Sequence, residues 1–455
     1  MIHALILAGG GGTRLWPFSQ EDRPKQFLTF SQDNQTLLQK TIQRLINSPL
    51  IQEIVVITQK KYQDLVEKDL SIFSKPVHIL IEPCPKNTAP AIALGVQFFH
   101  DVLHVKQDEK ILVLPSDHWI SPENLWLDDV EQISQLTEET IVTFGAKPSR
   151  PETGFGYLRI GKKHKTTYVV EEFVEKPSLD KALFYCNQKN YFWNCGMFFF
   201  SIQTFWKELS LYAPFIQSLC EEGYESALKN FSLMPSISID YAVMEKTKNI
   251  SMYPLSVQWS DVGSWDGVYE ILEKCPEGNV KIGNIVDVDT KNSLLISDHH
   301  FMCLAGLENI LVVHTKEGLF ISKKGESQKI KALMDMRKEK SPSISHSWGF
   351  YHLLQEDENF TLRKIVIHPD KKTDCFHNNS QFTLVKGSLK ALEGTRSYSL
   401  QEKETFILAD NQSCSFENTG KEEAMLIEMK FRKTPSSSLQ KLTKLQQVSQ
   451  KSHVH

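Results

Sequence analysis

The stretch that decides the fold is Leu5-Ile6-Leu7-Ala8-Gly9-Gly10-Gly11-Gly12-Thr13-Arg14-Leu15-Trp16-Pro17, followed by Pro24-Lys25-Gln26. Its apolar run, residues 4–7, is typical of a buried strand and ends in glycine. Glycines let a ligand approach the backbone without meeting a Cβ atom, and successive N–H groups form a concave anion site. Arg14 adds a planar donor fork and Lys25 a mobile ammonium. The stretch therefore predicts a triphosphate-binding loop after a first strand, with a plain glycine-rich turn as the alternative.

Two better-known phosphate-binding motifs do not fit this loop. No Gly-Lys-Ser/Thr sequence closes it, as a Walker P-loop requires, and Arg14 stands where the Rossmann fingerprint has its third glycine. The spelling LILAGGGGTRLWPFS followed by RPKQF instead resembles the sugar-1-phosphate nucleotidylyltransferases. Trp16, Ser19 and Lys25 resemble the mannose-1-phosphate guanylyltransferase branch. The resemblance implies a catalytic Arg14 and Lys25, which stabilise charge at phosphorus, and a nucleotide-binding loop made of Leu7, Ala8, Gly9, Gly10, Gly12, Thr13, Arg14 and Lys25.

Length, composition and charge narrow the class of protein. A chain of 455 residues exceeds the ~250–300 residues that one core supports, so we expect more than one domain. The net charge of −4 offers no basic field for nucleic acid. The eight cysteines form no Cys-x-x-Cys pair, which favours reduced thiols and a cytoplasmic location. We see no signal peptide and no apolar run near the ~20 residues of a membrane helix.

Strand-like and helix-like patterns alternate over the first 146 residues. Apolar runs at 4–7, 53–58, 77–82, 110–115 and 140–145 predict strands, and periodic patterns at 36–46, 61–70, 89–102 and 125–136 predict helices between them. Such alternation is typical of an α/β fold with a Rossmann-like, mostly parallel sheet that helices cover on both faces. We therefore expect ligands beyond the carboxyl ends of the strands.

Two motifs follow directly after predicted strands. In Glu82-Pro83-Cys84-Pro85-Lys86-Asn87-Thr88-Ala89-Pro90, Asn87 or Thr88 could simply cap a helix that begins near Ala89. The family resemblance places this segment against the base and ribose, so Lys86, Asn87 and Thr88 are nucleotide-binding candidates, with Lys86 where arginine is usual. In Leu112-Val113-Leu114-Pro115-Ser116-Asp117-His118 a buried strand delivers Ser116 and Asp117, which are further nucleotide-binding candidates.

A divalent cation is expected near Asp117. A single carboxylate there could be a helix cap or a surface residue, but nucleotidyl transfer uses a divalent cation, and Mg²⁺ prefers one or two carboxylates with substrate phosphates. The resemblance makes Asp117 the first ligand of Mg²⁺. The second is Asp261, in Gln258-Trp259-Ser260-Asp261-Val262-Gly263-Ser264-Trp265.

The motifs between these two aspartates resemble the acceptor half of the family. The resemblance implies that a sugar phosphate is bound by Gly156, Glu175, Lys176, Asn194 and Gly196. Taken alone, Glu175-Lys176 would be an ordinary charged strand end. Cys195 replaces the serine of a sugar-binding turn, which would remove one hydroxyl. The segment at 238–246 is also family-like, but its apolar positions fit a core equally well.

The rest of the chain is rich in β patterns. We expect a nucleotidyltransferase domain at 1–278, a closing β segment at 279–335, a cupin-like β-barrel at 341–432 and a polar tail at 433–455. The barrel resembles a phosphomannose isomerase domain, yet its four metal-ligand positions hold Thr373, Cys375, Ser380 and Cys414, and His377 stands alone. We therefore predict a noncatalytic cupin without isomerase activity. A thiolate site or disulfide of Cys375 and Cys414 is the less favoured alternative.

Together with these patterns, the family resemblance implies an enzyme that transfers GMP from GTP to α-D-mannose 1-phosphate, giving GDP-mannose and pyrophosphate for GDP-sugar and polysaccharide precursor synthesis. Its expected partners are GTP, mannose 1-phosphate and Mg²⁺, with no nucleic acid and no membrane. Two alternatives remain: another sugar-1-phosphate nucleotidylyltransferase, and a noncatalytic nucleotide-sensing subunit. The sequence leaves the oligomeric state open, a homo-oligomer included.

Overall fold

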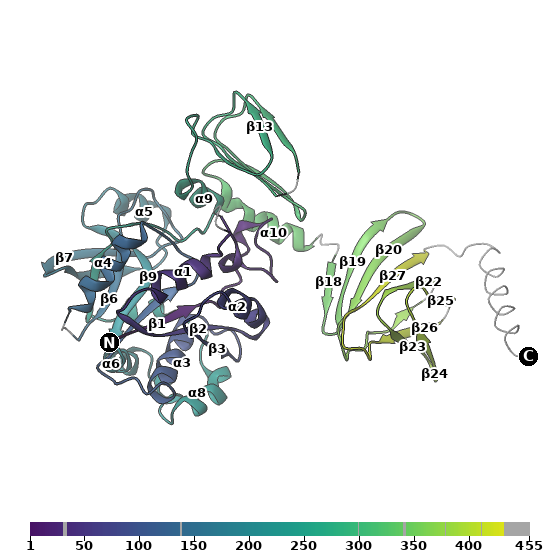
Figure 1. Ribbon diagram of the computed structural model, residues 1–455, viewed down its shortest axis with the longest axis horizontal. Coiled ribbons are helices and arrows are strands. Elements are labelled where there is room, and N and C mark those ends of the chain that lie inside the picture. Colours follow the sequence, from purple (N-terminus) through teal and green to yellow (C-terminus); the bar gives the residue numbers. More distant parts are fainter. Residues whose placement is uncertain are drawn as a thin grey trace, which may run out of the picture. The chain divides into compact units, whose positions relative to one another are not determined.

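The computed structural model describes residues 1–30, 34–136, 139–298, 300–339, 343–377, 379–410 and 412–431 (Figure 1). The chain divides into two compact units, Met1–Lys331 and Ala332–His455, which we describe separately. The tail expected at 433–455 lies outside the described residues.

The first unit is built on a nine-stranded sheet of order β3-β2-β1-β4-β9-β6-β10-β8-β7. Strands β1, β2, β3 and β4 run parallel, as predicted. Beyond them β9 runs antiparallel to both β4 and β6, and β10 pairs parallel with β6. The bounds of the sheet strands are β1 Ile2–Leu7, β2 Ile51–Gln59, β3 His78–Glu82, β4 Lys110–Pro115, β6 Ile141–Ala146, β7 Tyr157–His164, β8 Thr167–Val174, β9 Tyr191–Ser201 and β10 Ile250–Pro254.

Helices cover both faces of this sheet because successive side chains of each strand point to opposite faces. Leu5 packs in a cluster with side chains of α3 and α6, whereas Ala4 and Ile6 pack in another with side chains of α1, α2 and α4. The α-helices are α1 Leu37–Ile46, α2 Gln63–Leu70, α3 Thr88–Asp101, α4 Glu123–Ser134, α5 Leu179–Cys186, α6 Ile202–Tyr212, α7 Pro214–Ser218, α8 Tyr224–Asn230, α9 Trp265–Ile271 and α10 Ile330–Glu339.

Local sequence explains where these elements begin. Thr36 caps α1 in a capping box, in which the Gln39 N–H donates to the Thr36 hydroxyl and the Gln39 side chain accepts from the Thr36 N–H. Short single-turn helices and two minor strands complete this part of the unit: η1 Thr13–Leu15, η2 Lys25–Phe27, η3 Lys60–Tyr62, η4 Phe231–Leu233, η5 Asp240–Met244, β5 Trp119–Ser121 and β11 Gln258–Ser260. The five strands and four helices expected in the first 146 residues are thus confirmed, with ends shifted by at most two residues.

The predicted β segment forms two parallel ladders. Strands β12, β14 and β16 pair parallel, as do β13 and β15, and β17 closes the larger ladder antiparallel to β16. Parallel stacking of consecutive short strands is the arrangement of a β-helix. The bounds are β12 Val280–Ile282, β13 Ile285–Val288, β14 Leu294–Ser297, β15 Met302–Ala305, β16 Ile310–Thr315, β17 Gly318–Lys323 and η6 Ser327–Lys329.

This β-helix is fastened to the loop that opens the chain. The Trp265 indole donates to the Trp16 carbonyl at 2.9 Å, and the Asp266 carboxylate accepts from the Gly325 N–H at 2.6 Å. A Cβ at Gly318 would lie 2.6 Å from the Trp16 ring, so the two parts touch closely there. Residues 16 and 318 therefore belong to one packed structure.

The second unit is a two-sheet β structure with an aromatic core around Phe382 and Phe416. Its sheets have the orders β18-β19-β20-β27-β22-β25 and β21-β26-β23-β24, which is the cupin-like architecture expected. The strands are β18 Ser343–His346, β19 Gly349–Glu356, β20 Phe360–Ile367, β21 Phe376–His377, β22 Ser380–Lys386, β23 Leu389–Glu393, β24 Arg396–Leu400, β25 Thr405–Leu408, β26 Ser413–Glu417 and β27 Ala424–Phe431. Of the helices that the structure describes, none is long and apolar enough to cross a membrane.

Candidate active site

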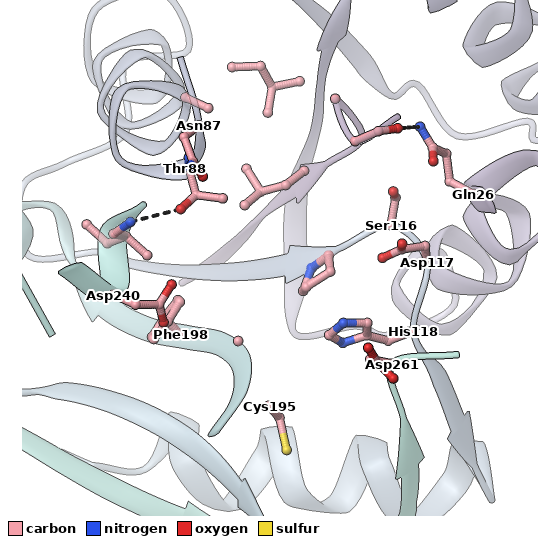
Figure 2. A pocket seen from close by; sticks show the side chains of 18 of the residues that line it. Gln26, Asn87, Thr88, Ser116, Asp117, His118, Cys195, Phe198, Asp240 and Asp261 are labelled. Carbon is pink, nitrogen blue, oxygen red and sulfur yellow. Dashed lines mark hydrogen bonds between the residues drawn. The ribbon is translucent and has the colours of Figure 1, made fainter. Parts of the chain in front are cut away.

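A cavity of about 620 Å³ lies at the carboxyl ends of β1, β2, β3 and β4, where parallel sheets bind ligands (Figure 2). It extends across the sheet to β8 and β9. The structure brings twelve of the sequence-predicted residues into its wall: Leu7, Gly9, Gly10, Asn87, Thr88, Ser116, Asp117, Gly156, Glu175, Asn194, Gly196 and Asp261.

Amide side chains hold the glycine loop in place. The Gln26 amide donates to the carbonyls of Ala8 and Gly10, each at 3.1 Å, and the Gln59 amide donates to the Gly9 carbonyl at 2.8 Å. Gly12 has φ +23°, and a Cβ there would lie 2.9 Å from the Cβ of Lys25. Glycine is therefore required at the point where the loop passes the catalytic candidate Lys25.

One corner of the cavity joins a cation to two acidic residues. Lys25 is almost fully buried, and its Nζ lies 2.7 Å from Asp117 Oδ2 and donates to the backbone carbonyl of Asp261. Burial acts to raise the pKa of Asp117, but the charge and hydrogen bond of Lys25 together with the effects of His118 and Arg14 outweigh it, so this pKa lies below its ordinary value. Asp117 therefore stays ionised at neutral pH.

His118, beside this corner, is held neutral. Burial lowers its pKa to about 4, against the opposing effect of Asp117. Trp259 can only donate, and its indole N–H lies 3.2 Å from His118 Nδ1, so the ring carries its proton on Nε2. Figure 2 shows the imidazole close to the Asp261 carboxylate. His118 thus adds a neutral donor and no charge.

The donor set of this corner fits a hard divalent cation. Asp117 and Asp261 come from different strand ends, and the Lys25 ammonium lies against oxygens of both residues, so the corner accommodates positive charge. Mg²⁺ takes one or two carboxylates together with substrate phosphates, so two aspartates beside a phosphate-binding loop are sufficient.

The segment after β3 forms another wall. Asn87 caps α3, with its Oδ1 accepting from the Thr88 N–H at 2.8 Å, and the Thr88 hydroxyl accepts from the Ile239 N–H at 2.8 Å. The helix-cap interpretation of this motif is thus correct, while both residues also line the cavity. Glu82, at the end of β3, is buried in the same wall, and burial raises its pKa.

The acceptor end is organised around Glu175 and Asn194. Lys176 forms an ion pair with Glu175, and a Cβ at Gly156 would lie 2.6 Å from Glu175 Oε2, so this carboxylate passes close to the backbone of the loop. The expected sugar-binding turn is instead a bulge inside β9, because the pairing with β6 slips near Asn194 and Gly196 has φ +63°. The prediction of a turn was wrong because apolar neighbours on both sides continue the strand.

Some predicted residues lie outside the cavity wall. Ala8, Gly12, Lys25, Lys86 and Lys176 adjoin lining residues without lining the cavity themselves. Arg14 is exposed on η1, close enough for its charge to lower the pKa of Asp117, and the side chain of Thr13 is not among those described. Cys195 lines the cavity, but its side chain packs into the apolar cluster on the α1 face, and burial raises its pKa.

Sequence reasoning missed three acidic or histidine residues among those that line the cavity: Glu82, His118 and Asp240. The first two stand inside the quoted motifs, Glu82 as the last residue of β3 and His118 soon after β4, and this position was the available signal. Asp240 gave a weaker signal, because its neighbours Ala242, Val243 and Met244 are buried and fit a core segment.

The cupin positions expected to have lost their metal ligands have structural contacts. Thr373 accepts from the Phe416 N–H at 2.9 Å, and Ser380 donates to Glu428 at 3.0 Å. Cys375 is exposed and Cys414 is buried with a pKa raised to about 12, mainly by burial; both thiols are free. Within the described part of the chain, no three His, Cys, Asp or Glu side chains are arranged to hold a metal.

Comparisons with known proteins agree with this architecture. Three family models match the chain: nucleotidyl transferase at residues 3–278, mannoseP isomerase/GMP-like beta-helix domain at 283–336, and mannose-6-phosphate isomerase C-terminal at 334–434. Mannose-1-phosphate guanylyltransferase 2 of Escherichia coli O157:H7 is 34% identical, covering 92% of each chain, and mannose-1-phosphate guanylyltransferase of Salmonella muenchen is 33% identical, covering 93% of this chain and 94% of its own.

A solved structure shows the same fold. The crystal structure of mannose-1-phosphate geranyltransferase from Thermus thermophilus is 29% identical, with a TM-score of 0.65 over 74% of this chain and 99% of that one. The family models, the full-length relatives and the shared fold converge. The chain belongs to the nucleotidyl transferase family, in the group of mannose-1-phosphate guanylyltransferases that carry a C-terminal mannose-6-phosphate isomerase-like domain.

Proposed function

We propose that this chain transfers GMP from GTP to α-D-mannose 1-phosphate, releasing pyrophosphate and GDP-mannose. The observation that carries the proposal is one continuous cavity with three parts. The glycine loop forms one side, and the Asp117 and Asp261 carboxylates form the corner beside it, with Lys25 bonded behind them. Glu175, paired with the adjoining Lys176, forms the far end. A triphosphate, a cation and a sugar phosphate each find complementary charge there.

In the proposed reaction a phosphate oxygen of mannose 1-phosphate attacks the α-phosphorus of GTP in line. The new bond joins that oxygen to the α-phosphorus, the bond from the α-phosphorus to the bridging oxygen breaks, and pyrophosphate leaves. Lys25 and Arg14 neutralise the triphosphate and the leaving group, and Lys176 holds the incoming phosphate. Catalysis then consists of positioning and preorganised charge, without a covalent enzyme intermediate.

Asp117 and Asp261 would hold Mg²⁺, which supplies charge neutralisation at the phosphate oxygens. The chain's own part is to keep both residues ready for it. Asp117 stays ionised because its pKa is depressed, and the Asp261 carboxylate is oriented by the Gly263 N–H, which donates to its Oδ1 at 3.0 Å.

The buried Glu82 supports guanine as the base. Guanine presents two adjacent donors, the ring N1–H and the 2-amino group, whereas adenine has an acceptor at N1. A carboxylate in the wall next to the glycine loop can accept both guanine donors but leaves adenine with an unfavourable acceptor pair. With adenine bound, a buried acceptor of Glu82 would stay without a donor. Leaving buried polar groups unpaired gives small binding sites their strongest discrimination between similar ligands.

The setting of the reaction is also a proposal. GDP-mannose is an activated sugar for polysaccharide precursor synthesis, and a relative 32% identical over 93% of this chain is named xanthan biosynthesis protein XanB, from Xanthomonas campestris pv. campestris. The eight free thiols support a reducing, cytoplasmic location. The contacts of Thr373, Ser380 and Cys414 support a cupin domain without isomerase activity.

The test is pyrophosphate release from the full chain with Mg²⁺, mannose 1-phosphate and each of GTP, ATP, UTP and dTTP. Fructose 6-phosphate formation from mannose 6-phosphate is followed in parallel. We expect release with GTP and no isomerisation. Release with another nucleotide alone would assign a different nucleotidylyltransferase, and no release with any nucleotide would favour a nucleotide-sensing subunit. Isomerisation would show that the cupin retains a metal site.

A further inference from the structure

A carboxylate that the proposed reaction does not use lies in the cavity wall. Asp240 begins the single turn η5 and lines the cavity, and Figure 2 shows it across the pocket from Asp117, His118 and Asp261. It is therefore far from the corner where the phosphates and the cation are expected. Its burial raises its pKa to about 6, so placing a carboxylate there is unfavourable for the protein unless something compensates it.

The contacts of Asn194 show how Asp240 is held in this place. The Asn194 oxygen accepts from the Thr143 hydroxyl at 2.8 Å and from the Gly196 N–H at 3.2 Å, which fixes the orientation of the amide. Its nitrogen then donates to Asp240 Oδ1 at 3.0 Å. Since both lone pairs of the amide oxygen are engaged, Asn194 has no acceptor left for a ligand hydroxyl.

Asp240 has the acceptor capacity that Asn194 lacks. A carboxylate offers about four lone-pair sites, of which the bond from Asn194 and a bond from the backbone of Asp240 itself use two. Glu175 and Lys176 are close enough to Asp240 for their charges to shift its pKa in opposite directions. Two carboxylates that accept from hydroxyl groups, beside an ammonium that binds phosphate, are complementary to a phosphorylated polyol.

Two parts of the substrates carry neighbouring hydroxyls: the hexose and the ribose of the nucleotide. The segment before Asp240 does touch the nucleotide wall, through the Ile239 N–H bonded to Thr88. The Asp240 side chain, however, accepts a hydrogen bond from Asn194 on β9, and the charges of Glu175 and Lys176 act on it. These contacts favour the hexose.

We propose that Asp240 is the acceptor for a hydroxyl group of the hexose, and that Thr143 and Asn194 are positioning residues that hold its carboxylate toward the sugar. This inference rests on the proposed function, because it names the part of mannose 1-phosphate that Asp240 binds. It adds to the expected sugar contact of Asn194 the role of a support for Asp240.

The first experiment compares Asp240→Asn with wild type by steady-state kinetics. The variant has nearly the same shape but loses the charge, so a charge-assisted hydrogen bond to the sugar is weakened. We expect KM for mannose 1-phosphate to rise about 10- to 100-fold. KM for GTP should stay within about threefold. Asp180→Asn, which removes an exposed carboxylate outside the cavity, is the matched control and should change neither constant.

Deoxy analogues of mannose 1-phosphate identify the hydroxyl. With wild type, one analogue in the 2-, 3- and 4-deoxy series should show kcat/KM about tenfold or more below that of mannose 1-phosphate. With Asp240→Asn the same analogue should show a much smaller decrease, because residue 240 already binds that hydroxyl weakly. Two variants test the hydrogen bonds that link Thr143 through Asn194 to Asp240. Thr143→Val should raise KM for mannose 1-phosphate without raising KM for GTP. Thr143→Ser keeps the hydroxyl and should have nearly the wild-type KM for mannose 1-phosphate.

The outcomes separate this inference from the proposed function. A wild-type protein that releases no pyrophosphate refutes the function, whereas direct calorimetric binding of mannose 1-phosphate to wild type and variant still tests Asp240. An increase confined to KM for GTP would assign Asp240 to the ribose and overturn the inference, as would unchanged constants for both substrates. If Asp240→Asn does not fold, the two Thr143 variants decide, and equal constants for all Thr143 forms would overturn it.

Discussion

Lys25→Met should have two effects of opposite sign. In the structure the Lys25 ammonium lies 2.7 Å from Asp117 Oδ2, with the two side chains 9% and 28% exposed, so a cation that binds Asp117 must first displace it. At an effective dielectric constant of about 20 the attraction is roughly 6 kcal/mol. Desolvation offsets most of this, which leaves about 1.5–3 kcal/mol for a charge-assisted pair. Removing the ammonium should therefore tighten Mn²⁺ binding to the nucleotide-free protein by about 10- to 100-fold, while GMP transfer falls by about 100-fold or more.

The assay is a Mn²⁺ titration of nucleotide-free protein followed by electron paramagnetic resonance, with pyrophosphate release measured on the same samples. Arg14→Met removes a nearby charge that is exposed, so it should change Mn²⁺ affinity by less than about threefold while lowering the rate of transfer. A folded Lys25→Met protein that binds Mn²⁺ no more tightly than wild type would refute the reasoning. The metal would then not compete with Lys25 for Asp117.

Three other contacts lead to further predictions. Glu82→Gln should lower kcat/KM for GTP by about tenfold or more, because an amide offers one acceptor oxygen instead of two. The ratio of kcat/KM for GTP to kcat/KM for ATP should also fall. If this ratio is unchanged, Glu82 does not take part in base recognition. Because burial raises the pKa of Asp240 to about 6, with Glu175 adding to and Lys176 opposing the shift, lowering the pH from 7.5 to 5.5 should protonate it. KM for mannose 1-phosphate should then rise more in wild type than in Asp240→Asn. The substrate phosphate titrates equally in both assays, so comparing the two proteins removes its effect. Thr36→Ala removes the cap of α1 and a hydrogen bond to the buried Asp69, so urea unfolding should show a loss of about 1–3 kcal/mol, and Thr36→Ser should retain most of the stability.

Local sequence patterns were sufficient for the elements of the first 146 residues. When an apolar run stops at glycine or proline, as at residues 4–7 or 110–115, that residue marks the end of the strand. The apolar composition of the run predicts that the strand is buried. The phosphate loop and Asp117 could also be named, because each follows such a run, whereas Asp261 was named only through the family resemblance of its motif. The parallel sheet then brings strand ends together at one edge.

What could not be predicted depends on contacts between distant segments. Asp240 becomes a cavity residue only because Asn194, 46 positions earlier, holds its carboxylate. The parallel pairing of β12, β14 and β16 was missed, since short β runs separated by turns fit antiparallel hairpins equally well. The sequence around Gly196 predicts a turn as readily as a β-bulge, because turns and bulges both use a glycine with positive φ.

The attachment of the β-helix to Trp16 also bears on the order in which the protein is made. The phosphate loop is among the first residues to leave the ribosome, yet the groups that fix its far end, Trp265, Gly318 and the Asp266 contacts with Ser327, are synthesised some 250 to 310 residues later. At ~5–20 residues per second this interval lasts roughly 12 to 60 seconds. During that time the chain has a glycine loop but no completed site. A growing chain therefore lacks the contacts that fix the far end of its phosphate loop until its β-helix has been made.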